Sequence, residues 1–458
     1  MKCVEDEIPF VLPEGWAWAR LGAVAEAISD GDHQPPPQTS SGIPFLVISN
    51  VSGGVLSFEN TRFVSVEYFN QLPETRKPRN GDLLFTVTGS YGIPVLVDTD
   101  DNFCFQRHIA MVRPCIISNR YLYIMLGSSY VKSICDNKAT GIAQKTVGLS
   151  TLRELLVPIA PLSQQIKIYE QAQSALCVVD GISSDKEDLL KTINNAKAKI
   201  LNLAIRGQLV PQDPADEPAS VLLERIRAEK EELIKQGKIK RDKKESVIFR
   251  GEDNSYYEKI GNDVCCIDEE IPFDIPDAWE WVRLENCCSK EIRRGKSPKY
   301  VDESGTLVFA QKCNTKYNGI DIGLALYLDE STLGKYPTDE FMQDGDVVVN
   351  STGTGTLGRV GFYRTSDNHI GLPIVPDSHV TVIRGDNSIQ AFYLYVFMKA
   401  NQSKIEKEGE GSTNQKELKP LTLKEMLVPM PPASEQKRIE AAITKAFVLI
   451  AMIEQSLS

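Results

Sequence analysis

The sequence predicts an α+β protein in which two repeated α/β domains are joined by two long helices that pair as an antiparallel coiled coil. The first observation is a repeat: IPFVLPEGWAWARL, beginning at Ile8, returns as IPFDIPDAWEWVRL at Ile271. The second is TLRELLVPIAPLSQQ, which returns as TLKEMLVPMPPASEQ at an offset of 271 residues. The third is an apolar heptad seam from Ile168 to Leu203 that starts again, in the same register, at Ile439. A duplicated domain that ends in a duplicated helix accounts for all three observations.

Length and composition set the general class. A chain of 458 residues exceeds one ordinary hydrophobic core, so two or more domains are expected. No apolar run of about 18 residues occurs and no apolar signal core follows Met1, so we expect a cytoplasmic protein. The ten cysteines are scattered or adjacent, without a C-x-x-C pattern, which argues against disulfide and zinc frameworks. The net charge of -11 means that any nucleic-acid contact must use local basic surfaces.

Residues 1–162 are predicted to form the first domain and residues 271–432 the second. In each copy a Gly-Asp turn feeds a short apolar strand, at 83–85 in the first and 347–349 in the second. Each strand ends in a glycine-containing loop, and each copy finishes by launching a helix. We therefore expect one fold, built twice.

Residues 163–207 are predicted to form the central helix and residues 433–458 the distal helix. At 1.5 Å per residue the central seam is about 53 Å long and the distal seam about 27 Å. Gly181 weakens the middle of the central helix, so an ordinary amphipathic helix on a domain core is the alternative. The repetition of the seam in register favours the coiled coil. The sequence identifies no partner for the C-terminal half of the central helix, from about Lys186 to Leu203.

Residues 208–270 have no counterpart in the first copy. They begin with the Pro-rich stretch 211–218 and continue with a charged helical stretch at 219–237. The basic run at 238–244 is more typical of a solvated surface than of a binding site, although contact with DNA or a partner stays open. We expect a linker with a charged helix, acting as a partly mobile bridge.

The string Gly353–Gly358 matches the G-x-G-x-x-G pattern of dinucleotide-binding proteins. A strand is expected after it, where that motif needs a helix, and Arg359 occupies the position where a P-loop needs lysine. The equivalent loop of the first copy, at 86–92, has only two glycines. We therefore interpret both as hairpin loops that present hydroxyls, glycine backbone and Arg359 to a ligand.

An early loop in each copy keeps a glycine followed by a proline but differs in charge. Residues 290–299 contain five cations and one acid, a composition suited to DNA phosphates or to the acceptor edge of guanine. In the first copy His33 and Gln34 are suited to an adenine or to a base amine. A solvated loop without a partner is the alternative for each residue.

Catalytic motifs are missing from the sequence. The four histidines lack metal-ligand spacing, no G-x-S-x-G occurs, and no Asn or Asp precedes a Pro-Pro-aromatic motif of the kind expected in a methyltransferase acting on a base amine. We expect a chain that is not an enzyme and binds no metal or cofactor itself.

Together these motifs resemble the specificity subunit (HsdS) of type I restriction-modification systems, over essentially the whole chain. The resemblance is carried by the two P-x-x-W-x-W-x-R-L motifs, the two Gly-Asp strands, STGTGTLGRVG at 351–361, the two LVP-x-x-P-x-S-x-Q helix openings, and GQLVPQDPADEPA at 207–219. Each motif alone is weak, and their combination is specific.

The resemblance implies that the repeats are target-recognition domains, each of which reads one half of a bipartite, asymmetric DNA site. It further implies that the helices set the spacing and dock two methyltransferase subunits, with restriction-translocase subunits in the full complex. S-adenosylmethionine, ATP and magnesium would serve those partners. Two alternatives stay open: a repeat-built protein-interaction adaptor, and a nucleotide-using enzyme with the Gly353–Gly358 loop.

The candidate DNA-binding residues lie in the loops that the two copies share. In the first domain they are His33, Gln34, Thr88, Ser90, Tyr91, Gln106, Arg107, His108, Gln144 and Lys145. In the second they are Arg293, Arg294, Lys296, Lys299, Gln311, Lys312, Asn314, Thr352, Thr354, Arg359, Gln415 and Lys416.

Overall fold

The computed structural model describes residues 5–32, 34, 36–141, 144–237, 246–316, 319–353, 355–409 and 416–457. The chain divides into two compact units, Met1–Asp185 and Lys186–Ser458, which we describe separately. No helix in these described ranges is long and apolar enough to cross a membrane.

Unit 1 contains a sheet with the strand order β2-β8-β5-β6, a smaller sheet with the order β4-β3-β7, and the pair β1-β9. Its strands are β1 (Ala17–Arg20), β2 (Ala25–Asp30), β3 (Ile43–Leu46), β4 (Arg62–Val64), β5 (Leu83–Thr86), β6 (Pro94–Leu96), β7 (Cys104–Phe105), β8 (Ile109–Pro114) and β9 (Leu156–Ile159). Its helices are α1 (Leu21–Val24), α2 (Val66–Gln71), α3 (Asn119–Leu126), α4 (Ser129–Lys138) and α5 (Leu149–Glu154).

Unit 2 repeats this plan, with sheets ordered β14-β21-β18-β19 and β15-β17-β16-β20 and the pair β13-β22. The strands are β13 (Glu280–Arg283), β14 (Arg293–Arg294), β15 (Tyr300–Val301), β16 (Leu307–Phe309), β17 (Leu326–Leu328), β18 (Val347–Asn350), β19 (Val360–Phe362), β20 (Ile374–Pro376), β21 (Val380–Ile383) and β22 (Leu427–Met430). The helices are α8 (Ala391–Ala400), α9 (Gln402–Lys407), α10 (Pro420–Lys424) and α11 (Ala433–Ser456). The duplicated α+β architecture predicted from the sequence is confirmed.

The apolar strand of each repeat is buried on both faces. Leu83 and Phe85 of β5 point into one core cluster and Leu84 into another, because successive side chains of a strand alternate between faces. In β18, Val347 and Val348 divide in the same way. A strand covered on both sides needs a continuous apolar run, as the sequence shows here.

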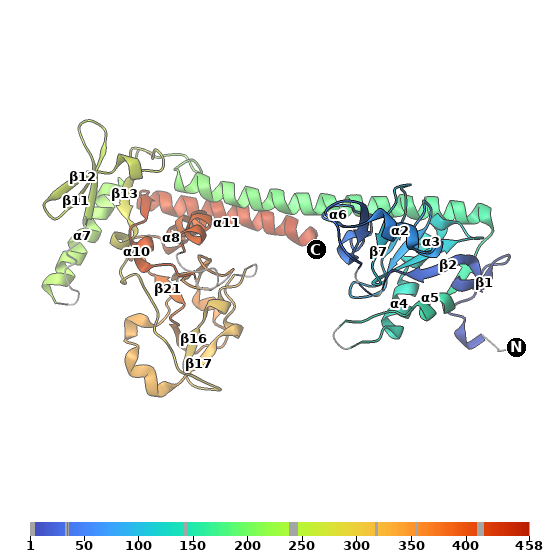
Figure 1. Cartoon of the computed structure of the whole chain (residues 1–458). Helices are drawn as coiled ribbons and strands as arrows, with labels where there is room; N and C mark the ends of the chain where they lie inside the picture. The colour runs from blue at the N-terminus through green and yellow to red at the C-terminus, as the bar shows by residue number, and fades with distance from the viewer. Residues whose placement is uncertain are drawn as a thin grey trace. The chain divides into compact units, whose positions relative to one another are not determined.

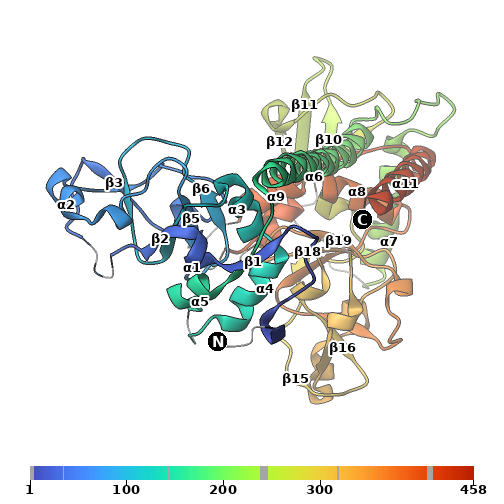
Figure 2. The same cartoon turned by 90° about the vertical axis from the view of Figure 1, so that its right-hand side faces the viewer.

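One sheet of each unit, β4-β3-β7 in unit 1 and β15-β17-β16-β20 in unit 2, lies at the end away from the long helix that follows the domain. In Figure 2, α2 and β3 of unit 1 lie far from α3 and from the start of α6 (Leu162–Ile205). In Figure 1, β16 and β17 of unit 2 lie far from α11. The other sheet of each unit, which contains β5 or β18, lies between these two ends.

The helix α6 begins and ends within two residues of the expected central helix, and α11 corresponds to the distal helix. In unit 2 the C-terminal part of α6 packs antiparallel to α11 (Figure 1). Leu201 and Ile205 of α6 share a core cluster with Ile439, and Lys197 pairs with Glu454 at 2.8 Å.

This pairing supplies the partner that the sequence left unassigned for the C-terminal half of the central helix. α11 starts beside the end of α6 and runs back along it, so its 24 residues cover that half. The middle of the predicted seam is solvent-exposed instead, with Val179 at 56% and Ile182 at 64% exposure.

The segment between the copies is more structured than a linker with a helix. Helix α7 (Ala219–Lys235) buries Leu222 and Ile226 in the core of unit 2. A three-stranded antiparallel sheet follows, which the sequence analysis did not predict: β10 (Ser246–Arg250), β11 (Tyr256–Ile260) and β12 (Asp263–Cys266). The basic run expected at 238–244 lies outside the described residues.

Candidate nucleic-acid interface

In unit 1, candidate residues that are far apart in the sequence gather around the loop after β5. Thr88 forms a bridge with Thr146, and the two hydroxyl oxygens lie 3.2 Å apart. The N–H of Gly89 donates to the carbonyl of Lys145 at 3.1 Å. The loop after β5 and the segment around Lys145 are therefore in direct contact.

The loop before β8 adjoins the early loop of the same domain. Gln106 forms a bridge with Asp32, two residues before Gln34. Arg107 donates to His108 Nε2 at 3.4 Å. Burial, and then the charge of Arg107, lower the pKa of His108, so the ring is neutral at physiological pH and can accept a hydrogen bond.

Unit 2 assembles the same four segments. Thr352 forms a bridge with Glu417, next to Lys416, and Lys296 forms one with Asp377. The hydroxyl of Thr352 lies 2.7 Å from His379 Nδ1. His379 matches His108 in the repeat, a signal that could have placed it among the candidates.

The glycines of the Gly353–Gly358 string are explained by backbone geometry. Gly353, Gly355 and Gly358 have φ values of 103°, 76° and 75°, in a backbone region that residues other than glycine rarely adopt. The strand expected after the string is confirmed as β19. The loop is therefore a tight hairpin connection, and it lacks the helix that a dinucleotide-binding turn requires.

Side-chain hydrogen bonds from Asn314 and to Gln311 connect this loop to the segment 311–314. Asn314 is 1% exposed and donates to Asn350 Oδ1 at 3.2 Å and to the carbonyl of Arg359 at 3.0 Å. Gln311 accepts the hydroxyl of Thr356 at 3.3 Å. In this conformation Asn314, proposed from the sequence to contact DNA, is a support for the loop.

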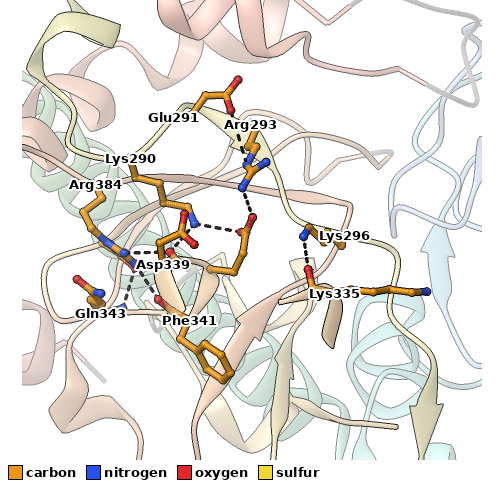
Figure 3. A network of polar contacts seen from close by, with 11 residues as sticks. Lys290, Glu291, Arg293, Lys296, Lys335, Asp339, Phe341, Gln343 and Arg384 are labelled. Atoms are coloured by element: carbon orange, nitrogen blue, oxygen red, sulfur yellow. Dashed lines mark hydrogen bonds and ion pairs between the residues drawn. The ribbon is translucent and has the colours of Figure 1, made fainter. Parts of the chain in front are cut away.

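The cationic stretch 290–299 is largely neutralised inside unit 2. Lys290 and Arg293, both labelled in Figure 3, donate to the same carboxylate, that of Glu340, which is 2% exposed. The Lys290 ammonium lies 3.0 Å from Glu340 Oε2, and Lys296 donates to the backbone carbonyl of Lys335.

The remaining cations of this stretch are also paired. Arg294 donates to Glu417 at 2.9 Å. Lys299 lies apart from the loop cluster, because its ammonium pairs at 2.7 Å with Asp329, which directly follows β17. The hydrogen bond from Lys299, followed by one from Ser331, lowers the pKa of Asp329 to about 2. The excess positive charge seen in the sequence is thus mostly cancelled by distant acids.

The structure places the other candidates at different depths. Exposed are Gln34, Ser90, Arg107, Gln144, Lys145, Lys299, Lys312 and Lys416; half-buried are Tyr91, Gln106, His108, Arg293, Arg294, Lys296, Gln311, Thr352 and Arg359; buried are Thr88 and Asn314. His33, Thr354 and Gln415 lie outside the described residues.

The described residues contain no cluster of three or more His, Cys, Asp or Glu side chains able to hold a metal ion. Burial raises the pKa of Cys104 to about 12 and that of Cys313 to about 11, which disfavours the thiolates.

Two copies of one α/β domain, each presenting a glycine loop amid polar side chains and ending in a long helix, define a duplicated recognition protein. The family model "Type I restriction modification DNA specificity domain" matches residues 13–174 and again 276–457, so the chain belongs to this family.

Curated relatives agree with this assignment. The EcoAI specificity subunit of Escherichia coli is 29% identical over 336 residues, covering 61% of this chain and 52% of that protein. The EcoEI specificity subunit of Escherichia coli is 29% identical over 514 aligned positions, covering 98% of this chain and 80% of that protein. The chain therefore spans about half the length of EcoAI and a larger part of EcoEI.

Solved structures share the fold. A chain from a study of the assembly and conformational transition of the type I R-M system superposes with a TM-score of 0.62 at 18% identity, covering 98% of this chain and 94% of that chain. The HsdS subunit from Thermoanaerobacter tengcongensis gives 0.51 at 17% identity, covering 98% and 93%.

Proposed function

We propose that this chain reads DNA for a type I restriction-modification complex and that each α/β domain reads one half of a bipartite, asymmetric site. The observation that carries the proposal is the duplicated loop cluster. Thr88 meets Thr146 in unit 1, whereas Thr352 meets Glu417 in unit 2. The same scaffold with different side chains suits two half-sites of different sequence.

In this proposal the helices set the distance between the half-sites and dock two methyltransferase subunits. The 44 residues of α6 correspond to about 66 Å of helix, more than one turn of DNA at ~34 Å. The exposed apolar side chains in the middle of α6 are suited to a helix of a partner.

Chemistry in this proposal belongs to the partners. The methyltransferase subunits would use S-adenosylmethionine, and restriction-translocase subunits in the full complex would use ATP and magnesium. The chain itself would contribute recognition without catalysis, and the complex would act in the cytoplasm.

The test is to co-express the chain with the methyltransferase subunits of its host and to sequence the methylome. We expect one methylated motif with two specified halves and a fixed spacer. Exchanging residues 21–155 for those of a relative should change one half only. Methylation without a bipartite motif, or a change in both halves, contradicts the proposal, and a chain that binds proteins but no DNA supports an adaptor.

A further inference from the structure

Unit 2 contains a cavity of about 470 Å³ beside the Gly353–Gly358 loop, to which no function has yet been given. Four cations line it, and Glu406 is the single carboxylate among its described lining residues: the cations are Lys316, Arg359, Lys399 and Lys416. Acids pair with most of the cations of the stretch 290–299, whereas the described lining of this cavity contains four cations and one carboxylate.

Neutral oxygens hold the two inner cations in place. Arg359 donates to the carbonyl of Asn314 at 2.8 Å and to that of Gly355 at 3.1 Å. Lys399 donates to the carbonyl of Val360 at 3.2 Å and to the amide oxygen of Gln402 at 2.7 Å. These contacts fix the geometry of the donors without neutralising them, an arrangement suited to an incoming anion.

The electrostatics of Lys399 agree with an anion site. Burial lowers its pKa, Glu406 opposes that effect, and the charge of Arg359 adds to it. Glu406 Oε1 also accepts a hydrogen bond from Gln402 at 2.7 Å. An anion in the cavity would stabilise the ammonium form of Lys399.

The described residues beside the equivalent loop of unit 1 are arranged differently. Gly92 and Gly358 close their loops by the same bond, to Thr86 and Asn350 respectively. Next to Gly92, Lys132 lies over the ring of Tyr91 at 4.2 Å and pairs with Asp136 at 3.4 Å. Beside Gly92, the described residues of unit 1 therefore place a tyrosine ring and a lysine that is paired with a carboxylate.

We infer that the cavity lined by Arg359, Lys399 and Lys416 binds one backbone phosphate of DNA, which anchors the second domain to its half-site. This inference rests on the proposed function. Arg and Lys donors beside a glycine loop match a phosphate group. The described lining contains no aromatic side chain on which a nucleoside could stack, and Lys416 adjoins the candidate DNA-binding loop, both of which favour the DNA backbone over a free nucleotide.

The test compares Lys399→Met and Lys416→Ala with the matched control Lys132→Met of unit 1, each in the full chain bound to its methyltransferase subunits. Affinity for the methylome-derived motif and for an unrelated duplex is measured over a range of KCl concentrations. The two cavity variants should bind both duplexes about tenfold more weakly. The slope of log affinity against log KCl concentration should decrease in magnitude by about 0.9, as expected for the loss of one phosphate contact. Lys132→Met should change neither.

Phosphate ethylation interference supplies a second measurement. With the wild-type complex, ethylation of one phosphate in the half-site of the second domain should block binding, and the cavity variants should lose that sensitivity. Since Lys416 is exposed, Lys416→Ala keeps the test decisive if Lys399→Met fails to fold.

The remaining outcomes overturn the inference in distinguishable ways. Unchanged slopes and an unchanged ethylation pattern, with sequence discrimination intact, refute the anchor and leave the proposed function standing. Loss of inorganic phosphate or ATP binding in Lys399→Met, with DNA binding unchanged, assigns the cavity to a free phosphate. A wild-type complex without DNA affinity refutes both proposals.

Discussion

Trp279 donates its indole N–H to the buried carboxylate of Glu435 at 2.8 Å, joining the opening motif of the second domain to the first turn of α11. In the first domain Trp16 makes the equivalent bond, also of 2.8 Å, to the amide oxygen of Gln164. The two copies keep the contact and differ in the charge of its acceptor.

This difference predicts a pH effect. Burial raises the pKa of Glu435, against hydrogen bonds from Trp279 and Gln212. A carboxyl group with a raised native pKa favours folding below its unfolded pKa, and this contribution is lost as the pH rises through the native pKa. Glu435→Gln removes this titrating carboxyl group. Between about pH 4 and about pH 7, the melting temperature of the wild type should therefore fall by about 2 °C relative to that of Glu435→Gln.

Thermal unfolding of the full chain at both pH values measures this effect. The matched control is Gln164→Glu, at an exposed position, which should leave the pH profile unchanged. An identical pH profile for Glu435→Gln and wild type would contradict the prediction.

A buried ion pair is repeated in the two domains and should be important for stability. Arg384 contacts both carboxylate oxygens of Asp346 at 2.7 Å, and Arg113 pairs with Asp82 at 2.8 Å. Asp346→Asn leaves the arginine without its charged partner and should lower the free energy of unfolding by about 3 kcal/mol. Urea unfolding measures the loss.

The control for that experiment is the exposed pair Lys191–Asp188, whose side chains are both 71% exposed. Lys191→Met should cost less than about 0.5 kcal/mol, because solvent screens the pair. Equal effects from the buried and exposed pairs would show that the Asp346 contact contributes little.

The exposed seam of α6 should matter for assembly more than for folding. Ile182→Glu should change the free energy of unfolding by less than about 0.5 kcal/mol, since the side chain is 64% exposed. It should weaken binding of a methyltransferase subunit at least tenfold, as measured by titration calorimetry. Lys191→Glu on the same helix is the charge control, and equal binding by Ile182→Glu and wild type would remove this surface from the proposed interface.

The contact between Thr352 and His379 should affect recognition in one half-site. Thr352→Val removes the hydroxyl that lies 2.7 Å from the ring nitrogen, leaving His379 free to turn. We expect a methylome with relaxed preference in the half read by the second domain and no change in the other. A motif altered in both halves would show that the loop acts through the fold as a whole.

The parts of the fold that recur were predictable from the sequence. The repeated Gly-Asp turns predicted β5 and β18, and the repeated LVP motifs predicted the starts of α6 and α11, because each repeat tested the other. The sheet β10–β12 occurs once, so no repeat marked it, and its strand β12 is exposed throughout.

The candidate site was less predictable, because charge in a sequence does not reveal its partners. The sequence predicted that Arg293 contacts a DNA phosphate. In the structure Arg293 donates to Glu340, which lies 47 residues away in the sequence. Lys399 was not among the residues predicted from the sequence, and the fold places it beside the glycine loop. Pairings of this kind depend on tertiary contacts that the spacing of residues along the chain does not encode.

The first and last strands of each domain are hydrogen-bonded neighbours, with Ala17 opposite Ile159 in one copy and Glu280 opposite Met430 in the other. A domain whose chain enters and leaves through one antiparallel pair can be replaced without moving the helix that follows. Under the proposed function, two crossovers between genes, one at each strand, would exchange one half-specificity in a single event. The paired entry and exit strands thus make each domain an exchangeable unit of the chain.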